Sequence, residues 1–422
     1  MSDDFIRVEG MQLILHDAPY LYAGTNMWFG AYLGAAGPGG QRARLVRELD
    51  LLREHGITNV RIMASSEASI LPAAVRPPIQ RAPGDVDEDL LCGLDFLLAA
   101  LGERGMHAVL YLTNFWDWSG GMSSYNAWTD GGAVPAIPDP ARGWEALVGY
   151  TATFYANSAA NELYRAQIHR LVTRTNAITG RVYRDEPAIM AWQLANEPRP
   201  GLYGARGEKN LPAFFSWLGE TAAFIHAIDP NHLVSTGSEG TEGCLGSDEH
   251  YITAHADAHI DYLTFHLWPY NWRWFDPSRP DATLPGTRER SNAYVQRHGA
   301  LARRIGKPIV LEEFGLPRDR GAVAAGTPTV ARDGFYSFIS DLLLGEIRSG
   351  SPLAGSNFWT WGGEGHTPPA GATEETDVSA PGDPPHEPQG LNSVYDTDIS
   401  TLTVIRGHAR LLEELRRLRM TA

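Results

Sequence analysis

Short apolar runs alternate with amphipathic stretches along most of the chain. The apolar runs predict strands at residues 20–24, 57–63, 106–112, 187–194, 232–235, 260–265, 308–312 and 356–359. Between them, apolar residues recur every three or four positions, which predicts helices at 42–55, 88–104, 161–173, 212–228, 293–305, 333–348 and 404–418. The segment 240–260 is poorly periodic, although a helix is expected there as well. The chain therefore repeats a unit of one strand and one helix.

Most of the predicted strands are continuous apolar runs without in–out alternation. Strands of a parallel sheet have this pattern because helices cover both faces of the sheet, and helical crossovers require parallel pairing. Eight such units predict a (β/α)8 TIM barrel with long βα loops at its C-terminal face. An open doubly wound sheet fits less well, because the loop 34–40 lacks the G-x-G-x-x-G spacing. No linker divides the sequence, so we predict one domain over residues 1–422.

The composition argues against several classes of protein. The 422 residues carry a formal net charge of −15 at pH 7. A global basic field is therefore absent, and we expect neither nucleic acid nor a membrane surface as a partner. Two cysteines, Cys92 and Cys244, cannot build a disulfide framework or a cysteine metal cluster. The sequence also lacks a P-loop, a Cys-x-x-Cys pair and a His-Glu-x-x-His helix, so no cofactor and no metal site are expected.

The beginning of the sequence bears on location. Residues Met1 to Phe5 are acidic and lack the basic-then-apolar pattern of a secretory signal. The longest apolar runs are far too short to cross a bilayer. On these grounds we expect a cytoplasmic protein.

Residues at the C-terminal ends of the predicted strands are polar, charged or aromatic, and in a TIM barrel these positions face the active site. They include Arg61, Asn114, Trp116, Asn196, Glu197, Arg199, His266, Trp268, Glu313 and Trp359. Nine of the 12 tryptophans lie at these ends or in the loops after them. Sugar rings stack their apolar C–H faces on aromatic planes and take hydrogen bonds at their hydroxyls, so the pattern indicates a carbohydrate site. The long loops 114–161 and 365–390 are expected to extend past the strand ends.

Two glutamates of this set supply what glycoside hydrolysis requires. Strands four and seven face each other across a small barrel, so Glu197 and Glu313 are expected to approach to about 5 Å, the separation found in retaining enzymes. One carboxyl is then a protonated acid and the other an ionised nucleophile. Arg61 and His266 are expected to keep the nucleophile ionised. Asn196 is placed to bind the hydroxyl beside the reacting carbon.

Glu312 and Glu313 are neighbours on one predicted strand. Adjacent side chains of a strand point to opposite faces, so only one of the two is expected to face the barrel mouth. We predict that Glu313 faces the mouth. Glu312 is then expected to lie against the surrounding layer, where a salt bridge or hydrogen bond satisfies it.

Several segments occur in a specific order that spans nearly the whole chain. They are Gly24-Thr25-Asn26, Ala191 to Arg199 (AWQLANEPR), His266-Leu267-Trp268-Pro269, Lys307 to Gly315 (KPIVLEEFG), Asn357-Phe358-Trp359, and Gln389-Gly390 before Ser393 to Asp398 (SVYDTD). With these segments the sequence resembles the β-mannanase subfamily of glycoside hydrolase family 5, within clan A of the retaining glycosidases. The Asn-Glu-Pro element alone marks only the broader clan.

The resemblance implies roles for individual residues. Glu197 is implied as the general acid/base because it follows Asn in the motif, and Glu313 as the nucleophile because it precedes an aromatic residue and Gly. The other matching substrate-site positions are Arg61, Asn196, His266 and Trp359, with Arg199 beyond the point of cleavage. Many relatives have a tyrosine that donates to the nucleophile at the position of Trp268. Here only an indole N–H is available as that donor.

We therefore expect an endo-acting enzyme that cleaves β-1,4-mannosidic bonds of β-mannan or manno-oligosaccharides with retention of configuration. An exo-acting β-mannosidase is an alternative if the loop after strand three or strand eight closes one end of the cleft. A carbohydrate-binding barrel without turnover is an alternative of another class, which would need the tryptophans but not the paired carboxyls. The preference for mannan over glucan rests on the family pattern, and the sequence does not set the oligomeric state.

Overall fold

The central sheet of the molecule is a barrel. In the computed structural model, which describes residues 4–72, 74–132, 134–135, 144–366 and 382–420, eight parallel strands form one sheet. In their order of pairing they are β10 (Leu233–Ser235), β9 (Ile189–Gln193), β8 (His107–Tyr111), β5 (Ile57–Met63), β4 (Tyr22–Asn26), β13 (Leu353–Phe358), β12 (Ile309–Phe314) and β11 (Leu263–Leu267). This arrangement confirms the predicted TIM barrel.

At the two ends of this order, β10 and β11 are joined through backbone hydrogen bonds between each strand and the residues that flank the other. Asp261 N donates to Val234 O at 2.8 Å, and His266 N donates to Glu239 O at 3.1 Å. The sheet therefore closes on itself, and the C-terminal ends of its strands meet at one mouth.

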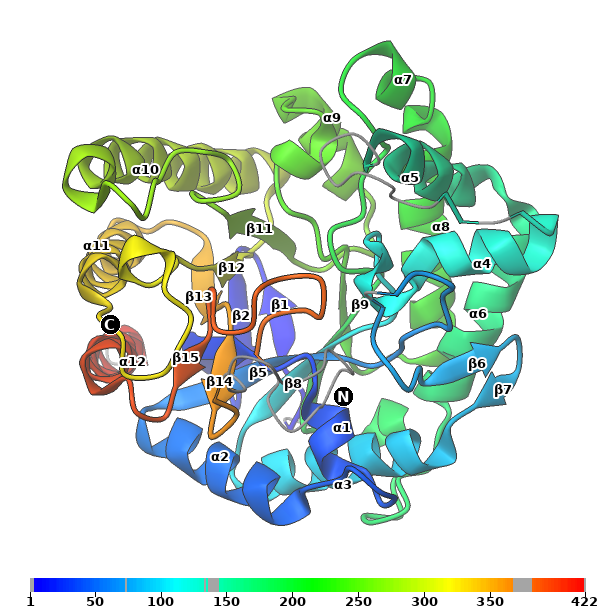
Figure 1. The fold of residues 1–422 in the computed structure, drawn as a ribbon, viewed down its shortest axis with the longest axis horizontal. Helices are drawn as coiled ribbons and strands as arrows, with labels where there is room; N and C mark the ends of the chain where they lie inside the picture. Colours follow the sequence, from blue (N-terminus) through cyan, green and yellow to red (C-terminus); the bar gives the residue numbers. More distant parts are fainter. Residues whose placement is uncertain (1–3, 73, 133, 136–143, 367–381, 421–422) are drawn as a thin grey trace.

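Helices surround the strands and form the crossovers between them (Figure 1). They are α2 (Arg42–Glu54), α3 (Glu88–Glu103), α6 (Ser158–Val172), α8 (Leu211–Ile228), α9 (Asp248–His255), α10 (Pro280–Ile305), α11 (Val330–Arg348) and α12 (Ile399–Met420). Most lie close to their predicted ranges, but α10 begins at Pro280, well before residue 293. Proline suits a first turn because the amide it lacks would have no intrahelical partner there.

A small antiparallel sheet covers the N-terminal end of the barrel. Its strands are β1 (Arg7–Glu9), β2 (Gln12–Leu15) and β3 (Ala18–Pro19), paired in that order. Leu13 packs with Val109, Met190 and Val310, whose side chains come from three barrel strands. Apolar side chains therefore seal this end, and a ligand site is expected at the opposite end.

The described part of the long segment after β8 is largely helical, so the description of 114–161 as a loop was wrong there; residues 133 and 136–143 lie outside the described residues. It contains η1 (Asp117–Ser119), α4 (Gly121–Asp130), α5 (Trp144–Thr151) and η2 (Ala152–Ala156). Aromatic rings hold it together: Tyr125 lies 5.2 Å from Trp128 and 6.0 Å from Phe154, measured between ring centroids. Such local aromatic packing does not need the long helical repeat on which the prediction depended.

The remaining elements lie in the other loops. They are α1 (Gly30–Gly34), β6 (Gln80–Ala82), β7 (Asp85–Val86), η3 (Tyr183–Asp185), α7 (Ala205–Glu208), η4 (Glu242–Cys244), η5 (Asp319–Gly321), β14 (Trp361–Gly363) and β15 (Val394–Tyr395). Of the loop predicted at 365–390, residues 367–381 lie outside the described residues.

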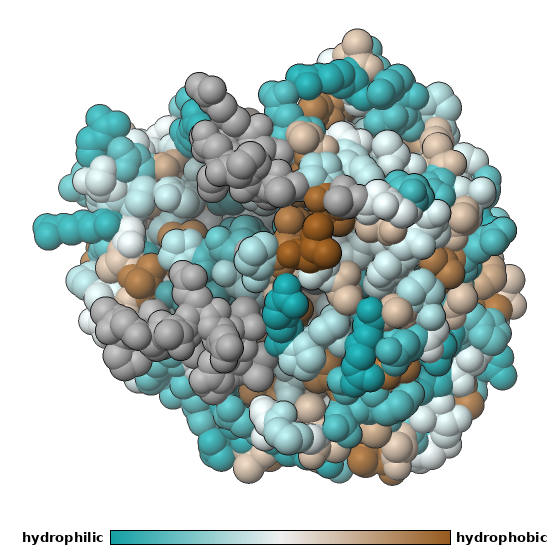
Figure 2. Space-filling model, turned by 45° about the vertical axis from the view of Figure 1, so that its right-hand side comes forward, coloured by the Kyte–Doolittle hydropathy of each residue, from teal (hydrophilic) through white to brown (hydrophobic). Residues whose placement is uncertain are grey.

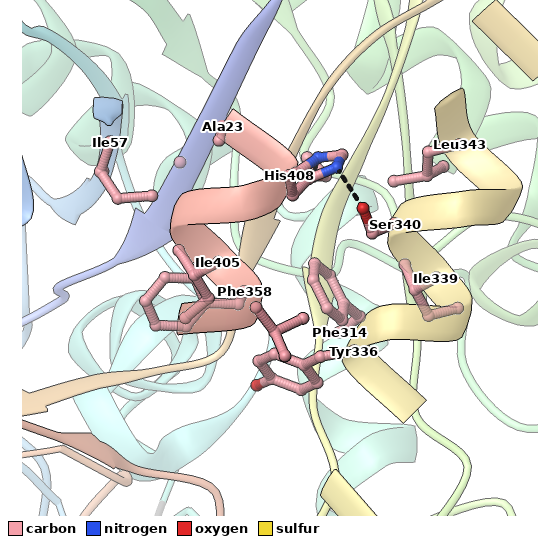
Figure 3. Close-up of a pocket in the computed structure, with 13 residues that line it drawn as sticks. Ala23, Ile57, Phe314, Tyr336, Ile339, Ser340, Leu343, Phe358, Ile405 and His408 are labelled. Carbon is pink, nitrogen blue, oxygen red and sulfur yellow. Dashed lines mark hydrogen bonds between the residues drawn. The ribbon is translucent and has the colours of Figure 1, made fainter. Parts of the chain in front are cut away.

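A small cavity lies between the barrel and the helices α11 and α12 (Figure 3). Its volume is about 20 Å³, which is room for about one water molecule. His408 enters it from α12 and shares a hydrogen bond of 3.0 Å with Ser340 Oγ of α11. Most of the other lining side chains are apolar, so this space is a packing gap and is too small for a sugar.

Hydrophobic and hydrophilic residues are mixed on the exposed surface. Figure 2 shows a face on which hydrophobic residues form small groups among hydrophilic ones. The exposed large apolar side chains include Ile70, Val330 and Ile399. Among the described helices, none has the length and apolar character needed to cross a membrane.

Candidate active site

The C-terminal ends of four strands bring two acids and two bases together. Arg61 lies in β5, His266 in β11 and Glu313 in β12, while Glu197 follows the end of β9. All four are buried at the barrel mouth, with 7% of Glu197 and 2% of Glu313 exposed. The structure thus brings these four predicted residues to one place.

The backbone at Glu197 is strained. Its φ is 50°, in the left-handed region that residues other than glycine rarely adopt. The amide of Glu197 donates to Gly237 O at 2.9 Å, which ties this turn to the loop after β10. Strained residues of this kind are retained where their surroundings hold them, and they cluster at functional sites.

His266 connects the two carboxyls. Its Nδ1 lies 2.7 Å from Glu197 Oε1 and 3.2 Å from Glu313 Oε2. One ring nitrogen of His266 and one oxygen of each carboxyl all lie within 4.8 Å of one another. A carboxylate oxygen only accepts hydrogen bonds, so Nδ1–H donates to Glu197, while Glu313 is within ion-pair distance of the same nitrogen. Nδ1 then has no free lone pair, and the three side chains suit a proton-sharing site better than a metal site.

Arg61 is fully buried and fixes the side chains around it. Its guanidinium donates to Gln193 Oε1 and to Asn196 Oδ1, both at 2.8 Å, to Asn26 Oδ1 at 3.2 Å, and to Glu313 Oε1. The planar fork of an arginine holds such partners in fixed directions. Arg61 therefore orients Glu313 and Asn196 together.

Glu312 lies inside the barrel, so the prediction that it faces the surrounding layer was wrong. Gln193 Nε2 donates to its Oε1 at 2.6 Å, and Arg61 Nε lies 3.4 Å from its Oε2. The cause is a β-bulge, because the register of β12 against β11 shifts by one residue between Leu311 and Glu313. A bulge interrupts the alternation of faces, and both neighbouring glutamates point inward.

Trp116 and Arg199 contact the other side of Glu197. The indole Nε1–H of Trp116 donates to Glu197 Oε2. The Arg199 guanidinium lies 4.7 Å from the centroid of the Trp116 ring and forms an ion pair with Glu239. Both predicted residues are therefore at the site, and Glu239, for which no role was predicted, holds Arg199 there.

A cleft of about 320 Å³ opens at these carboxyls, within the size range of small-molecule sites. Its lining includes Asn196, Trp116, Trp268 and Trp359, all of them predicted. Trp268 packs edge to face on Trp359, with ring centroids 5.9 Å apart. Within the described part of the chain, no hydrogen bond joins the Trp268 indole to Glu313. Arg61 is the donor to that carboxyl instead.

Loop residues complete the cleft, and of these only Trp118 and Trp272 belonged to the tryptophan pattern that indicated a carbohydrate site. They are Trp118 and Trp144 after β8, Asn271 and Trp272 after β11, and Pro384, His386 and Glu387 after β14. The His386 ring stacks on Trp118 with centroids 6.5 Å apart, and it meets Trp144 at 6.3 Å. The tryptophan-rich composition was a signal for the first two loops, whereas for the third only its length and position after the last strand indicated a place at the mouth.

Comparison with known proteins identifies the family. The model described as "GH family 5 beta-mannosidase-like" matches residues 3–417. The chain belongs to this glycoside hydrolase family. A family 5 mannosidase from Rhizomucor miehei is 33% identical, with a TM-score of 0.89 over 99% of this chain and 100% of that one. Mannan endo-1,4-β-mannosidase 1 from Oryza sativa is 29% identical over 371 residues, 84% of this chain and 78% of its own length.

A more distant solved structure shares the fold. The endo-β-1,4-mannanase from Thermotoga petrophila superposes with a TM-score of 0.67 at 24% identity, over 93% of this chain and 77% of that one. The family assignment therefore rests on the family model and on the nearer relatives.

Burial and charge separate the pKa values of the two carboxyls in this family 5 glycoside hydrolase. Burial raises the pKa of Glu313 to about 7, although the His266 and Arg61 cations act to lower it. Burial also acts to raise the pKa of Glu197, but the hydrogen bond and charge of His266 outweigh it and lower that pKa to about 2. Burial acts to lower the pKa of His266, yet the surrounding carboxyls raise it to about 10. The two catalytic candidates thus share one proton in acidic solution.

Proposed function

We propose that this enzyme hydrolyses β-1,4-mannosidic bonds of β-mannan or manno-oligosaccharides by double displacement, with retention at the anomeric carbon. The observation that carries the proposal is the pair of buried carboxyls, Glu197 and Glu313, whose oxygens come within 4.8 Å of each other at a tryptophan-lined cleft. A binding barrel without turnover has no need of such a pair. The mannosidase and mannan endo-mannosidase names of the similar proteins support mannan as the substrate class.

The reaction takes two steps, with Glu313 as nucleophile and Glu197 as acid/base. The Glu313 carboxylate attacks the anomeric carbon while Glu197 gives its proton to the glycosidic oxygen, and the bond to the leaving sugar breaks. The remaining sugar is then an ester of Glu313. Glu197, now ionised, takes a proton from water, which attacks the same carbon and restores the Glu313 carboxylate. Two inversions at one carbon give net retention.

The contacts of the two glutamates support this division of roles. Arg61 donates directly to Glu313, and a cation in this place stabilises the carboxylate that leaves in the second step. Glu197 instead contacts Trp116, beside Arg199. The family pattern puts Arg199 beyond the point of cleavage, which is the side of the leaving sugar.

The shared proton has to lie on Glu197 for the first step. Burial favours the proton on Glu313, whose pKa is raised, whereas the His266 Nδ1–H, at 2.7 Å from Glu197 and 3.2 Å from Glu313, favours the ionised form of Glu197. His266 contacts both carboxyls and so provides a short path for the proton between them. A bound sugar favours this transfer, because its glycosidic oxygen accepts from Glu197 while its electron-poor anomeric carbon faces Glu313.

The other predicted residues bind the sugar or orient the acids. Those that line the cleft and are proposed to contact substrate are Trp116, Asn196, Arg199, Trp268 and Trp359. Arg61 and His266 are fully buried, and neither lines the cleft. We infer that these two act on the sugar through Glu313 and Glu197.

Azide trapping with two alanine variants tests the roles. In Glu313→Ala, azide attacks an aryl β-mannoside once and gives the inverted α-mannosyl azide. In Glu197→Ala, azide replaces water in the second step and gives the β-mannosyl azide. A dinitrophenyl leaving group is used because its departure needs no acid. Azides of the same configuration from both variants would contradict the assignment, and a wild-type protein that cleaves neither mannan nor mannosides would contradict the proposed function.

Exo action is a second candidate, favoured by one contact between loops. His386, after β14, packs on Trp118 and Trp144 from the segment after β8. These are the two loops whose meeting would close one end of the cleft. A closed end accepts only the terminus of a chain, whereas an open cleft accepts its middle. The 33% identity to a mannosidase also supports exo action.

Mannohexaose distinguishes the two modes. Early in the reaction, endo cleavage gives fragments of two to four sugars, whereas exo cleavage gives mannose together with mannopentaose. A hexaose blocked at its non-reducing end sharpens the comparison, because an exo enzyme acting from that end leaves it intact while an endo enzyme still cleaves it.

A further inference from the structure

Glu312 is buried among the residues that hold the catalytic pair. Its side chain is inaccessible to solvent. Gln193 Nε2 donates to Oε1 at 2.6 Å, while Arg61 Nε lies 3.4 Å and His266 Nε2 lies 3.9 Å from Oε2. Double displacement gives this carboxyl no step, although a carboxylate is costly to bury. Its presence therefore requires an explanation.

Two buried polar atoms of this group lack a hydrogen-bond partner among the described residues. They are Glu312 Oε2 and His266 Nε2. They face each other at 3.9 Å, which is too long for a hydrogen bond but close enough for a strong attraction between charges. The other nitrogen of the same ring donates to Glu197. Carboxyls on both sides of His266 therefore favour the imidazolium.

The buried group contains three carboxyls and two bases. Arg61 is always charged, and the raised pKa of His266 makes it a cation at neutral pH. Two positive charges balance two carboxylates, so the third carboxyl is neutral when the group has no net charge. Water does not screen charges buried this completely, and an uncompensated one is strongly destabilising. One carboxyl of the three is therefore expected to keep a proton.

Other titratable groups surround Glu312 and the catalytic pair. The phenols that face the group from β4, β8, α9 and the start of β11 are Tyr22, Tyr111, Tyr251 and Tyr262, and burial raises the pKa of each far above neutrality. Arg199 is paired with Glu239. Burial raises the pKa of Glu239 to about 7 and that of Glu387 to about 8, so only the shift between wild type and variant, which share these two acids, is assigned to Glu312.

We propose that Glu312 is a positioning residue that keeps one proton on the catalytic pair. Its carboxylate, which accepts from Gln193 and lies 3.4 Å from Arg61 Nε, holds His266 as imidazolium and leaves no cation to balance a second catalytic carboxylate. Without it, Arg61 and His266 balance both Glu197 and Glu313, and the proton is lost at neutral pH. This inference rests on the proposed double displacement, in which that proton goes to the leaving group.

Glu312→Gln tests the proposal, because it removes the charge and keeps the size of the side chain. A unit charge within about 4 to 6 Å shifts a pKa by about 1 to 3 units, so the alkaline limb of kcat/KM is expected to move to lower pH by at least about one unit. With mannobiose at pH 7, kcat/KM is expected to fall at least about fivefold, with a much smaller fall at pH 4.5. With dinitrophenyl β-mannoside, which needs no acid, the loss at pH 7 is expected to be small.

Two control variants isolate the effect. Glu48 is a buried carboxyl that pairs with Arg44 and is not part of the cleft lining, so Glu48→Gln is expected to keep the wild-type pH profile. Glu239→Gln measures how much of the alkaline limb belongs to Glu239. A Glu312→Gln profile of wild-type shape, lowered equally at every pH and for both substrates, overturns the proposal because a merely structural role acts in that way.

The outcomes also separate this proposal from the proposed function. If the wild type cleaves neither substrate, the proposed function fails; if it shows the bell-shaped profile and Glu312→Gln keeps it, only the role of Glu312 fails. Should Glu312→Gln not fold, histidine NMR of the wild type provides the test. The His266 ring is expected to carry both protons at pH 8, and a neutral ring at pH 7 overturns the proposal.

Discussion

Replacing Glu67 by glutamine is expected to remove part of the pH dependence of folding stability. Glu67 is fully buried after β5, and its carboxyl lies 2.9 Å from Ser65 Oγ, 2.9 Å from Gly121 N and 3.2 Å from Tyr125 OH. Burial raises its pKa to about 7 despite these hydrogen bonds. When protonated, Glu67 donates to the Tyr125 hydroxyl, which donates in turn to Gln80 Oε1 at 2.9 Å. A glutamine amide reproduces this arrangement without a charge.

The raised pKa fixes the sign and size of the effect. The native state binds the proton more tightly than the unfolded chain, whose pKa is the ordinary 4.5. The stabilisation is therefore complete below about pH 4.5 and is lost as the pH rises through about 7. A difference of about 2.5 pKa units corresponds to about 3 kcal/mol of unfolding free energy. The Glu67→Gln variant has no such loss.

Urea unfolding of both proteins at pH 4, 5, 6, 7 and 8 measures this effect. The difference in unfolding free energy is expected to change by about 3 kcal/mol in favour of the glutamine variant between pH 4 and pH 8. Both proteins contain the other buried acids, so the titration of those acids cancels in the difference between the two unfolding free energies. A difference that stays constant across this range would refute the raised pKa of Glu67, whichever protein is the more stable.

Three further changes test other parts of the structure. Trp116→Phe removes the N–H that donates to Glu197 and is expected to lower kcat/KM for mannobiose about 10- to 100-fold with an unchanged melting temperature. Asp398→Asn leaves the buried Arg318 without its carboxylate and is expected to reduce the unfolding free energy in urea by roughly 3–5 kcal/mol. Asp383→Ala removes the acceptor of three backbone amides in the loop that carries the cleft residues after β14. We expect KM to rise by a larger factor than kcat changes, and an unchanged KM would contradict a role of that loop in binding.

The barrel could be predicted because its strands are buried on both faces and appear as apolar runs. The strand predicted at 57–63 is β5 itself. The predicted strand ends are wrong where polar residues continue a strand into the barrel mouth, as Asn26 does at the end of β4 and His266 within β11. The first half of α10 was missed because its sequence is polar and lacks apolar spacing. The expectations of one domain and of a cytoplasmic location stay predictions.

The two carboxyls at the mouth could be located from strand ends and motifs, but other parts of the site could not. His386 and Glu387 reach the cleft because Asp383 anchors the backbone of their loop, and that anchoring has no periodic signature. The sequence identified Glu239 only as a residue near a strand end, because its pairing with Arg199 depends on how two loops meet.

The inward position of Glu312 depends on tertiary pairing and not on local sequence. If β12 were regular, alternation would turn Glu312 toward the helices, and Arg61 and His266 would face only Glu197 and Glu313. Two cations would then balance two carboxylates, and no proton would remain for the leaving group at neutral pH. The bulge therefore adds a third carboxyl to the buried group, which ties a strand irregularity to the acid chemistry of the site.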